Sequence, residues 1–421
     1  MQRLCPTRLD MQSGKSGSAG RAIVTAAGTS AGRRRRTPCQ TLGIAGDHIG
    51  YPATAKRAVT RFSLATVGGR IPRRASSGRV KPRRTDAFLS TETASGWISD
   101  LELMHHYTSV SYRTFSHSQQ TQKTLQYDVP REALSYPFLL HQLLAFSAYH
   151  LAYLQPDCRH AYLMQAAQHQ NDAINGMRGT LLGTISSTNC HALFASSIFL
   201  TLSAFATYPS YEKYSPSFSP IDSIIDIFTL TDGMSVILRA SDDDLRKGPI
   251  RDLFIRGPHD NNPSAVVEAS LEPLYERLPR LSSRLADLAP GDGDRKYTVN
   301  NAVIALSEAI SKVSVNAVSA PVEFRVVFMW PILVSTDYLD MLRRRHPAAL
   351  VVMAHYCVIV AMAEPFCWFL NGWARTLVTA ISEQLMATPW ADLILWPVEV
   401  VGLGGYEAHV DQLTHAMPIA L

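Results

Sequence analysis

The stretch from Ala348 to Leu377, AALVVMAHYCVIVAMAEPFCWFLNGWARTL, is the longest nearly uncharged run in the chain and constrains its fold most. No charged side chain stands between Pro347 and Ala363, so a helix here is apolar on nearly every face and needs burial in a large protein or a bilayer. A membrane span needs roughly 20 apolar residues, whereas this run contains His355 and ends at Glu364-Pro365. We therefore predict a core helix, not a membrane span, that starts at Pro347 and ends or kinks at Pro365.

Charge divides the chain into two unlike parts. Residues 1–84 hold 18 of the 40 Lys/Arg and 2 of the 35 Asp/Glu, which leaves 22 basic and 33 acidic residues for residues 85–421. A basic segment that is poor in large apolar residues cannot offset its ordering entropy. The acidic remainder is long enough to bury a sizeable core. We predict a disordered basic arm over residues 1–96 and a single large domain over residues 97–421.

The arm carries two basic clusters, Arg33, Arg34, Arg35 and Arg36 and then Arg73, Arg74, Lys81, Arg83 and Arg84. Such clusters serve as nuclear localisation signals or loose nucleic-acid contacts, and we predict a nuclear protein on this ground. Two other interpretations of the basic arm stay open. One is an inert solvated tail, and the other is a mitochondrial transit peptide, because Arg-rich and acid-poor describes those too.

Helical periodicity recurs through the rest of the chain. Leu101, Met104, Tyr107 and later residues follow three- and four-residue spacings, and Ser99 with Glu102 matches a capping box at the start of that helix. Residues 137–156, 190–207 and 221–239 continue the pattern, whereas residues 241–263 have the composition of a polar loop. No strand-like alternation bounded by hairpin turns appears. The predicted fold class is all-α.

The search for catalytic chemistry yields one candidate. The sequence contains no HExxH, GxSxG or kinase motif. Asp242, Asp243 and Asp244 form the one acidic cluster that could hold Mg²⁺, which favours an isoprenoid-processing enzyme as an alternative function, but Leu245-Arg246-Lys247 follows where a further acid is needed. A loop or helix-start acidic cluster is the simpler interpretation.

Histidines and cysteines give no metal motif. His105, His106 and His355 have no partner at metal-ligand spacing, and the six cysteines form no CxxC pair. We interpret the histidines as structural and the cysteines as reduced, and we expect an intracellular protein.

An all-α body rich in aromatic and methionine side chains either packs solidly or encloses a cavity for an apolar ligand. Several phrases bear on this choice: LELMHHYTSVSY (101–112), VPREALSYPFLLHQLLAFSAYHLAYLQP (129–156), LFASSIFLTLSAFA (193–206), PAALVVMAHYCVIVA (347–361), NGWARTLV (371–378) and WADLILWPVEVVGL (390–403). In order and spacing, this set resembles the regulatory domain of fungal zinc-cluster transcription factors, in particular the sterol uptake control branch. The resemblance covers residues 100–406.

The resemblance implies an all-helical regulatory domain, often dimeric, joined to a DNA-binding cluster in which six cysteines hold two zinc ions. In sterol-sensing members, it implies an apolar sterol pocket near the C-terminal helices that influences nuclear entry. This chain departs from the pattern, because only Cys5 and Cys39 precede the body. A two-zinc cluster cannot form from two cysteines, so we predict no cofactor and only weak or indirect contact with DNA.

The predicted function is regulation of RNA polymerase II transcription in a sterol or secondary-metabolite pathway, without enzymatic activity. A homodimer, or a heterodimer with full-length relatives, and an apolar ligand such as a sterol are the predicted partners. A ligand-binding module without direct DNA binding is a further alternative. The candidate pocket wall and lid consist of Phe199, Met353, Tyr356, Trp368, Trp373, Gly402, Gly404 and Gly405.

Overall fold

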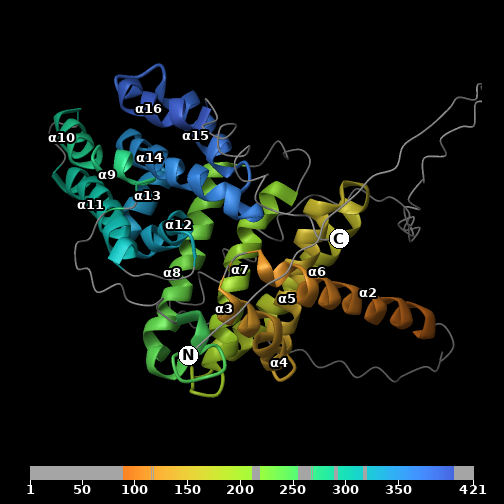
Figure 1. The fold of residues 1–421 in the computed structure, drawn as a ribbon. Coiled ribbons are helices and arrows are strands. Elements are labelled where there is room, and N and C mark those ends of the chain that lie inside the picture. The colour runs from red at the N-terminus through yellow and green to blue at the C-terminus, as the bar shows by residue number, and fades with distance from the viewer. Residues whose placement is uncertain are drawn as a thin grey trace, which may run out of the picture. The chain divides into compact units, whose positions relative to one another are not determined.

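The computed structural model describes residues 89–402, except 115, 117, 211–218, 255–266, 268, 289–292 and 316–319. Every regular element within these residues is helical, which confirms the all-α prediction (Figure 1). Both basic clusters of the arm, together with Gly404 and Gly405, lie outside the described residues.

Fifteen α-helices make up the described part of the chain, and short helical turns connect several of them. The first seven are α2 (Leu89–Ser109), α3 (Gln119–Lys123), α4 (Val129–Ala133), α5 (Pro137–Leu154), α6 (Arg159–Leu181), α7 (Cys190–Ser210) and α8 (Pro220–Leu245). The remaining eight are α9 (Glu272–Tyr275), α10 (Leu278–Leu288), α11 (Gly293–Val315), α12 (Val322–Leu333), α13 (Thr336–Arg343), α14 (Pro347–Ala363), α15 (Trp373–Leu385) and α16 (Ala391–Gly402).

Helices α7 and α8 join two groups of helices. On one side α5 packs against α2, α6 and α7, and on the other α14 packs against α11, α12, α13, α15 and α16. Helix α7 packs against α8, and α8 also contacts α12, α13 and α15. The apolar core therefore runs without a break from α2 to α16.

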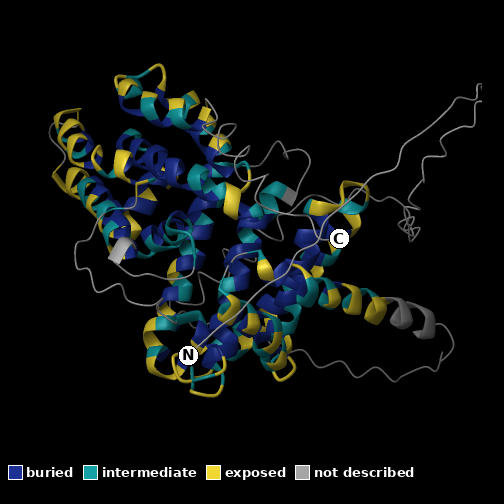
Figure 2. Cartoon of the chain, in the orientation of Figure 1, coloured by how far each residue is buried: buried dark blue, intermediate teal, exposed yellow. Residues whose placement is uncertain are grey.

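Helix α14 begins at Pro347, as predicted, and ends at Ala363, two residues before Pro365. Every side chain from Ala348 to Val360 is buried, and α14 is dark blue over most of its length in Figure 2. Burying a side chain of the size of Val, Leu, Ile or Met is worth about 1.5–3 kcal/mol. The helix is fixed in place by Tyr338, whose hydroxyl donates to the Ala349 carbonyl at 3.0 Å.

Among the residues that the structure describes, two helical segments are long and apolar enough to cross a membrane, Cys190–Pro209 and Pro347–Phe366. In the most apolar 18-residue stretch of each, 83% of the first and 72% of the second are buried inside the protein. Their composition is therefore accounted for by the core positions of α7 and α14.

The prediction for the start of the first body helix is wrong. Helix α2 begins at Leu89, so Ser99 lies in its interior and caps nothing. The Ser99 hydroxyl donates to Gln165 Oε1 at 3.0 Å, and Glu102 Oε1 accepts from the Tyr162 hydroxyl at 2.9 Å. Both side chains join α2 to α6, a tertiary use that the local capping pattern does not reveal.

Candidate ligand-binding site

An aromatic cluster lies where α2, α5, α7 and the turn Trp368–Leu370 meet. Phe146 is its centre, with ring centroids 5.4 Å from Phe199 and 5.6 Å from Trp368. Tyr107 of α2 approaches Phe199 edge-on at 5.7 Å. Two of the predicted site residues, Phe199 and Trp368, are thus brought together through a side chain that the sequence did not single out.

A second aromatic cluster contains Tyr356. Its ring lies 4.6 Å from Trp330 and 5.4 Å from Phe228, and its hydroxyl donates to the Val327 carbonyl at 2.9 Å. Met353, one turn earlier on α14, is also fully buried. The structure places these two predicted residues in close packing between α8, α12 and α14.

Trp373 begins α15 and is buried between α7 and α15. Its Nε1 donates to the Phe205 carbonyl at 2.9 Å, and its ring lies 5.2 Å from Tyr208. Gly372 precedes it with φ of 83°, a conformation that glycine adopts at little cost. Gly402 is the exposed last residue of α16. The predicted residues therefore occupy several places in the fold.

A pocket of about 230 Å³ opens beside Phe199. Helix α7 contributes one wall and the segment around α3 and α4 another, with α8 and α12 opposite. Its lining is apolar except for Ser116 and Thr121: Leu125, Val129, Phe194, Ala195, Ile198, Phe199, Leu202, Met234, Leu253, Ala320, Phe324 and Phe328. An apolar hollow with a few polar groups is typical of small-molecule sites.

One wall of this pocket is held by a buried carboxylate that the sequence analysis missed. Asp252 accepts from Gln120 Nε2 at 2.8 Å and from the Thr124 hydroxyl at 3.0 Å. The chain makes a π-helical turn at Thr124–Asp128, where the Tyr107 hydroxyl donates to the Leu125 carbonyl at 3.0 Å. Such turns are rare and frequent at functional sites. Asp252 stands in a stretch predicted to be a polar loop, so no local signal marked it.

Trp368 closes the other side of the aromatic cluster. Its Nε1 donates to the Thr114 hydroxyl at 3.2 Å. It stacks on His150, whose Nδ1 lies 3.1 Å from His106 Nε2. Burial lowers the pKa of His150 to about 3 and that of His106 to about 4; His106 further disfavours charge on His150, and His105 further disfavours charge on His106. Both rings are therefore neutral at pH 7.

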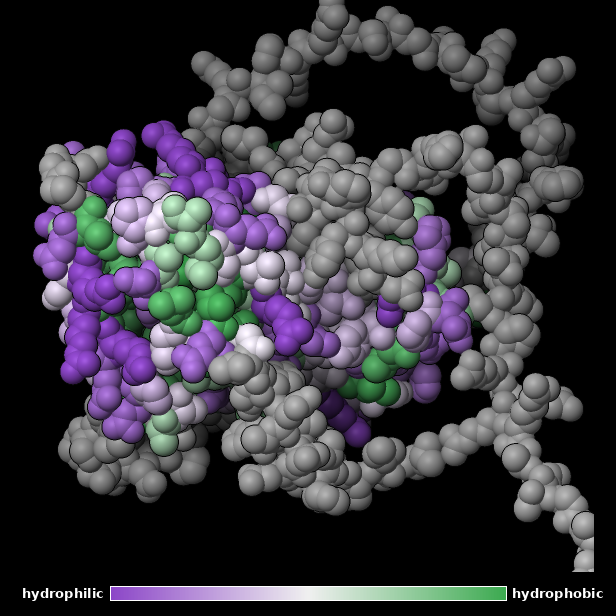
Figure 3. Space-filling model, turned by 90° about the horizontal axis from the view of Figure 1, so that it is seen from above, coloured by the Kyte–Doolittle hydropathy of each residue, from purple (hydrophilic) through white to green (hydrophobic). Residues whose placement is uncertain are grey.

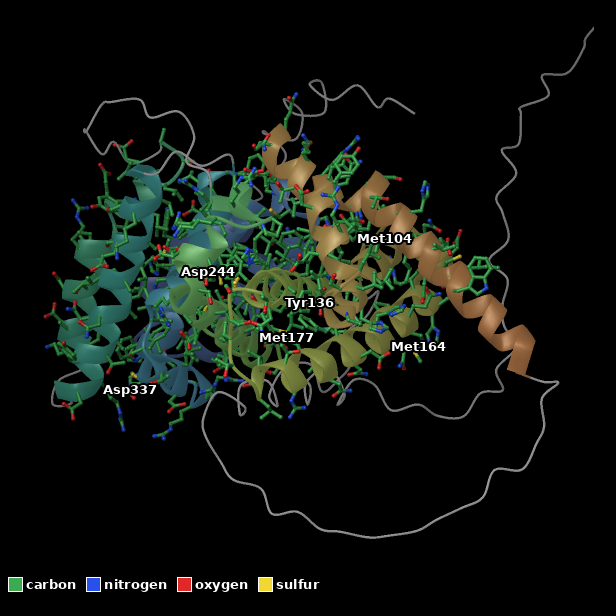
Figure 4. The ribbon with its side chains drawn as sticks, turned by 90° about the horizontal axis from the view of Figure 1, so that it is seen from below. Met104, Tyr136, Met164, Met177, Asp244 and Asp337 are labelled. Carbon is green, nitrogen blue, oxygen red and sulfur yellow. The ribbon has the colours of Figure 1, made fainter. Side chains whose placement is uncertain are left out.

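The acidic triplet lies at the start of a short helical segment, which agrees with the simpler interpretation. Ser241 has non-helical φ and ψ angles and kinks α8, and Asp242, Asp243 and Asp244 follow it before the helix ends at Leu245 (Asp244 is labelled in Figure 4). The Asp242 carboxylate accepts from Arg246 Nε at 2.9 Å, and this contact lowers the pKa of Asp242. The charge of Asp242 is thus balanced by an arginine one turn away.

Two of the described thiols do not suit metal binding. Cys357 and Cys367 are buried, and burial raises the pKa of each thiol well above its ordinary value. The thiolate is the form that binds zinc. Within the ranges that the structure describes, no three His, Cys, Asp or Glu side chains lie close enough to hold a metal ion.

In sequence, the chain is similar to fungal transcription factors. Residues 102–212 match the family described as "Fungal specific transcription factor domain". Sterol uptake control protein 2 of Candida albicans is 25% identical over 300 residues, 68% of this chain and 40% of that protein. The Zn(2)-C6 fungal-type transcription factor afumD of Aspergillus fumigatus is 25% identical over 282 residues, 63% of this chain and 68% of that protein.

A third relative, a Zn(2)-C6 fungal-type transcription factor of Gibberella zeae, is 22% identical over 316 residues, 73% of this chain and 62% of that protein. The chain thus spans between two fifths and two thirds of the length of these relatives. Residues 102–212 are thus similar to a fungal specific transcription factor domain, and two of the relatives are named as transcription factors. The family match contains no zinc-cluster domain.

Proposed function

We propose that this chain regulates RNA polymerase II transcription in a sterol or secondary-metabolite pathway, and that an apolar small molecule bound beside Phe199 controls its activity. The relatives named sterol uptake control protein and Zn(2)-C6 transcription factor support the regulatory part. The apolar pocket of about 230 Å³ supports the ligand. This pocket is the main observation on which the proposal rests.

The volume of the pocket limits the size of the ligand that it can hold. Drug-sized ligands occupy pockets of about 300–1,000 Å³, so a volume of about 230 Å³ accepts a smaller molecule or part of a larger one. A whole sterol requires α7 and α12 to move apart. The pocket wall opposite α12 is held by the π-helical turn and by the contacts of Asp252. An opening of the pocket would begin at this wall.

Contact with DNA is proposed to be indirect. Cys5 and Cys39 are the cysteines that this chain has before α2, and a cluster of two zinc ions needs six. Association with a full-length relative would bring the chain to a promoter, and the basic clusters of the arm would direct it to the nucleus. A ligand-binding module without a transcriptional role remains the second candidate, and reporter output separates the two.

The exposed apolar face of α2 suits a second copy of the chain as its partner. Leu103 and Tyr107 face the core, whereas Trp97, Ile98 and Leu101 are 57%, 56% and 57% exposed. Trp97, Leu101 and Met104 follow the four-then-three spacing with which paired helices interlock. Pairing of two α2 helices would remove these side chains from water, and it supports the proposed dimer.

Fluorescence titration with dehydroergosterol, a fluorescent sterol, tests the ligand. The full chain is compared with Ile198→Trp, which fills the pocket, and with Met164→Trp, which places the same side chain on the exposed face of α6. We expect the chain and Met164→Trp to bind and Ile198→Trp to lose binding. Equal binding by all three proteins contradicts a site beside Phe199.

A further inference from the structure

A larger hollow lies away from the Phe199 pocket, between α10, α11 and the start of α14. Its volume is about 570 Å³, which is within the about 300–1,000 Å³ of small-molecule sites. Apolar side chains form its floor and sides: Leu285, Ala286, Leu288, Val299, Pro347, Ala348 and Trp390. In Figure 3, apolar atoms bordered by hydrophilic residues are visible on the side where α10 and α11 lie in Figure 1.

The rim of this hollow is cationic, although residues 85–421 are acidic as a whole. Arg295 and Lys296, both exposed, lie on the first turn of α11 and line it. A neighbouring hollow of about 400 Å³ shares Arg295, His346 and Pro347 and adds Arg344. The acidic residues that also line this neighbour are Asp337 and Asp340, and Asp340 accepts from Arg343 at 2.7 Å.

A polar pair stands between floor and rim. The Ser282 hydroxyl donates to Asn300 Oδ1 across α10 and α11. Because Oδ1 of Asn300 accepts this hydrogen bond, the Nδ2 group is the end of the amide that can donate to a ligand oxygen. From the depth of the hollow to its edge, the lining therefore changes from apolar side chains to the amide of Asn300 and then to the two cations.

We infer that this hollow binds an amphipathic carboxylate, a molecule with an acyl chain and an anionic head group. The acyl chain lies over Leu288 and Tyr297, which are 36% and 70% exposed, and its contact with them removes apolar surface from water. The head group lies between Arg295 and Lys296, where charge-assisted hydrogen bonds are strongest. A neutral sterol uses the floor but gains nothing from the cations, so this ligand class differs from the one proposed for the Phe199 pocket.

Calorimetric titration of the full chain with sodium laurate tests this assignment. Arg295→Gln with Lys296→Gln removes the rim charge, and Arg280→Gln with Arg284→Gln removes two cations elsewhere on α10. We expect the rim variant to bind laurate about tenfold more weakly, the combined worth of two exposed charge contacts, and the control to bind as the parent does. Methyl laurate, which has no charge, should bind the parent as weakly as laurate binds the rim variant.

Filling the hollow gives an independent test. Ala286→Trp and Leu288→Trp each place an indole in it, whereas Ser283→Trp places one on the exposed face of α10. We expect the first two variants to lose laurate binding and the third to keep it. Ile198→Trp should also bind laurate normally, which separates this site from the Phe199 pocket. Absence of laurate binding by the parent chain, or equal binding by all variants, overturns the inference.

Discussion

The indole ring of Trp368 stacks on the imidazole ring of His150, with centroids 4.7 Å apart and planes inclined by 26°. Trp368 follows α14 in the chain, and His150 is near the end of α5. His150 Nδ1 also lies 3.0 Å from the Ser111 hydroxyl, so α2, α5 and the segment after α14 meet at this ring. The stack therefore fastens the first helices of the described domain to its C-terminal group.

Replacement of Trp368 by Ala should destabilise the domain by about 2–4 kcal/mol, less than the loss for a fully buried Trp because part of this side chain is exposed. The substitution removes the ring packing against Phe146, Tyr153 and Phe369 and the hydrogen bond to Thr114. Urea unfolding measures the change. Trp368→Phe, which keeps a ring, should cost less than Trp368→Ala, and an equal cost for both would count against ring stacking as the cause.

Acid should unfold the domain through its buried histidines. Burial lowers the pKa of His150 from 6.5 to about 3, with a contribution from His106, and lowers that of His355 to about 4. A group with a lowered pKa stabilises the fold above pH 6.5, and this stability is lost as the pH falls toward the folded-state value. The loss at His355 amounts to about 3 kcal/mol. Unfolding followed between pH 7 and 4 should show it, and His355→Gln should reduce the slope.

Glu364 should act in the opposite direction. Its carboxylate accepts from the Ala374 N–H at 2.9 Å at the start of α15, but burial outweighs this contact and raises its pKa from 4.5 to about 7. Its contribution to stability is therefore complete below pH 4.5 and decreases as the pH rises to 7, by up to about 3 kcal/mol. Glu364→Gln keeps an oxygen for Ala374 and should be more stable than the parent at pH 8 but not at pH 4. Equal stability differences at both pH values would contradict this account.

Polar substitutions on the outer face of α2 should weaken self-association without unfolding the domain. Trp97→Ser with Leu101→Ser removes two exposed apolar side chains, whereas Leu134→Ser removes a more exposed one, 77% accessible, from the segment after α4. Light scattering coupled to size-exclusion chromatography measures the mass. We expect the double variant to shift toward monomer and Leu134→Ser to behave as the parent chain.

Much of the fold could be predicted because its signals are local. Pro347 and Pro365 delimit α14, and the uncharged run between them dictates burial, so this helix was predicted within two residues at its end. The start of α2 could not be predicted in the same way. Ser99 and Glu102 form a valid capping pattern, but their side chains bind Gln165 and Tyr162 of α6, and contacts across 66 and 60 residues leave no trace in local spacing.

The candidate site was less predictable than the fold for the same reason. Phe199 could be identified as an apolar residue of a buried helix, but the hollow beside it arises where α7, α8, α12 and a π-helical turn fail to fill space together. Asp252 holds that turn from a segment with loop composition. Apolar composition alone does not distinguish Phe199, which lines the pocket, from Tyr356, whose ring is enclosed by Trp330 and Phe228.

The central claim is that an apolar ligand in the Phe199 pocket controls transcription. Its most direct test is a reporter gene driven by the full chain fused to a heterologous DNA-binding domain, in cells with and without depletion of sterols, with Ile198→Trp and Met164→Trp beside the parent. We expect the output of the parent and of Met164→Trp to change on depletion, and that of Ile198→Trp to stay constant in both conditions. An identical response by Ile198→Trp and the parent, or no reporter output from any fusion, would contradict the claim.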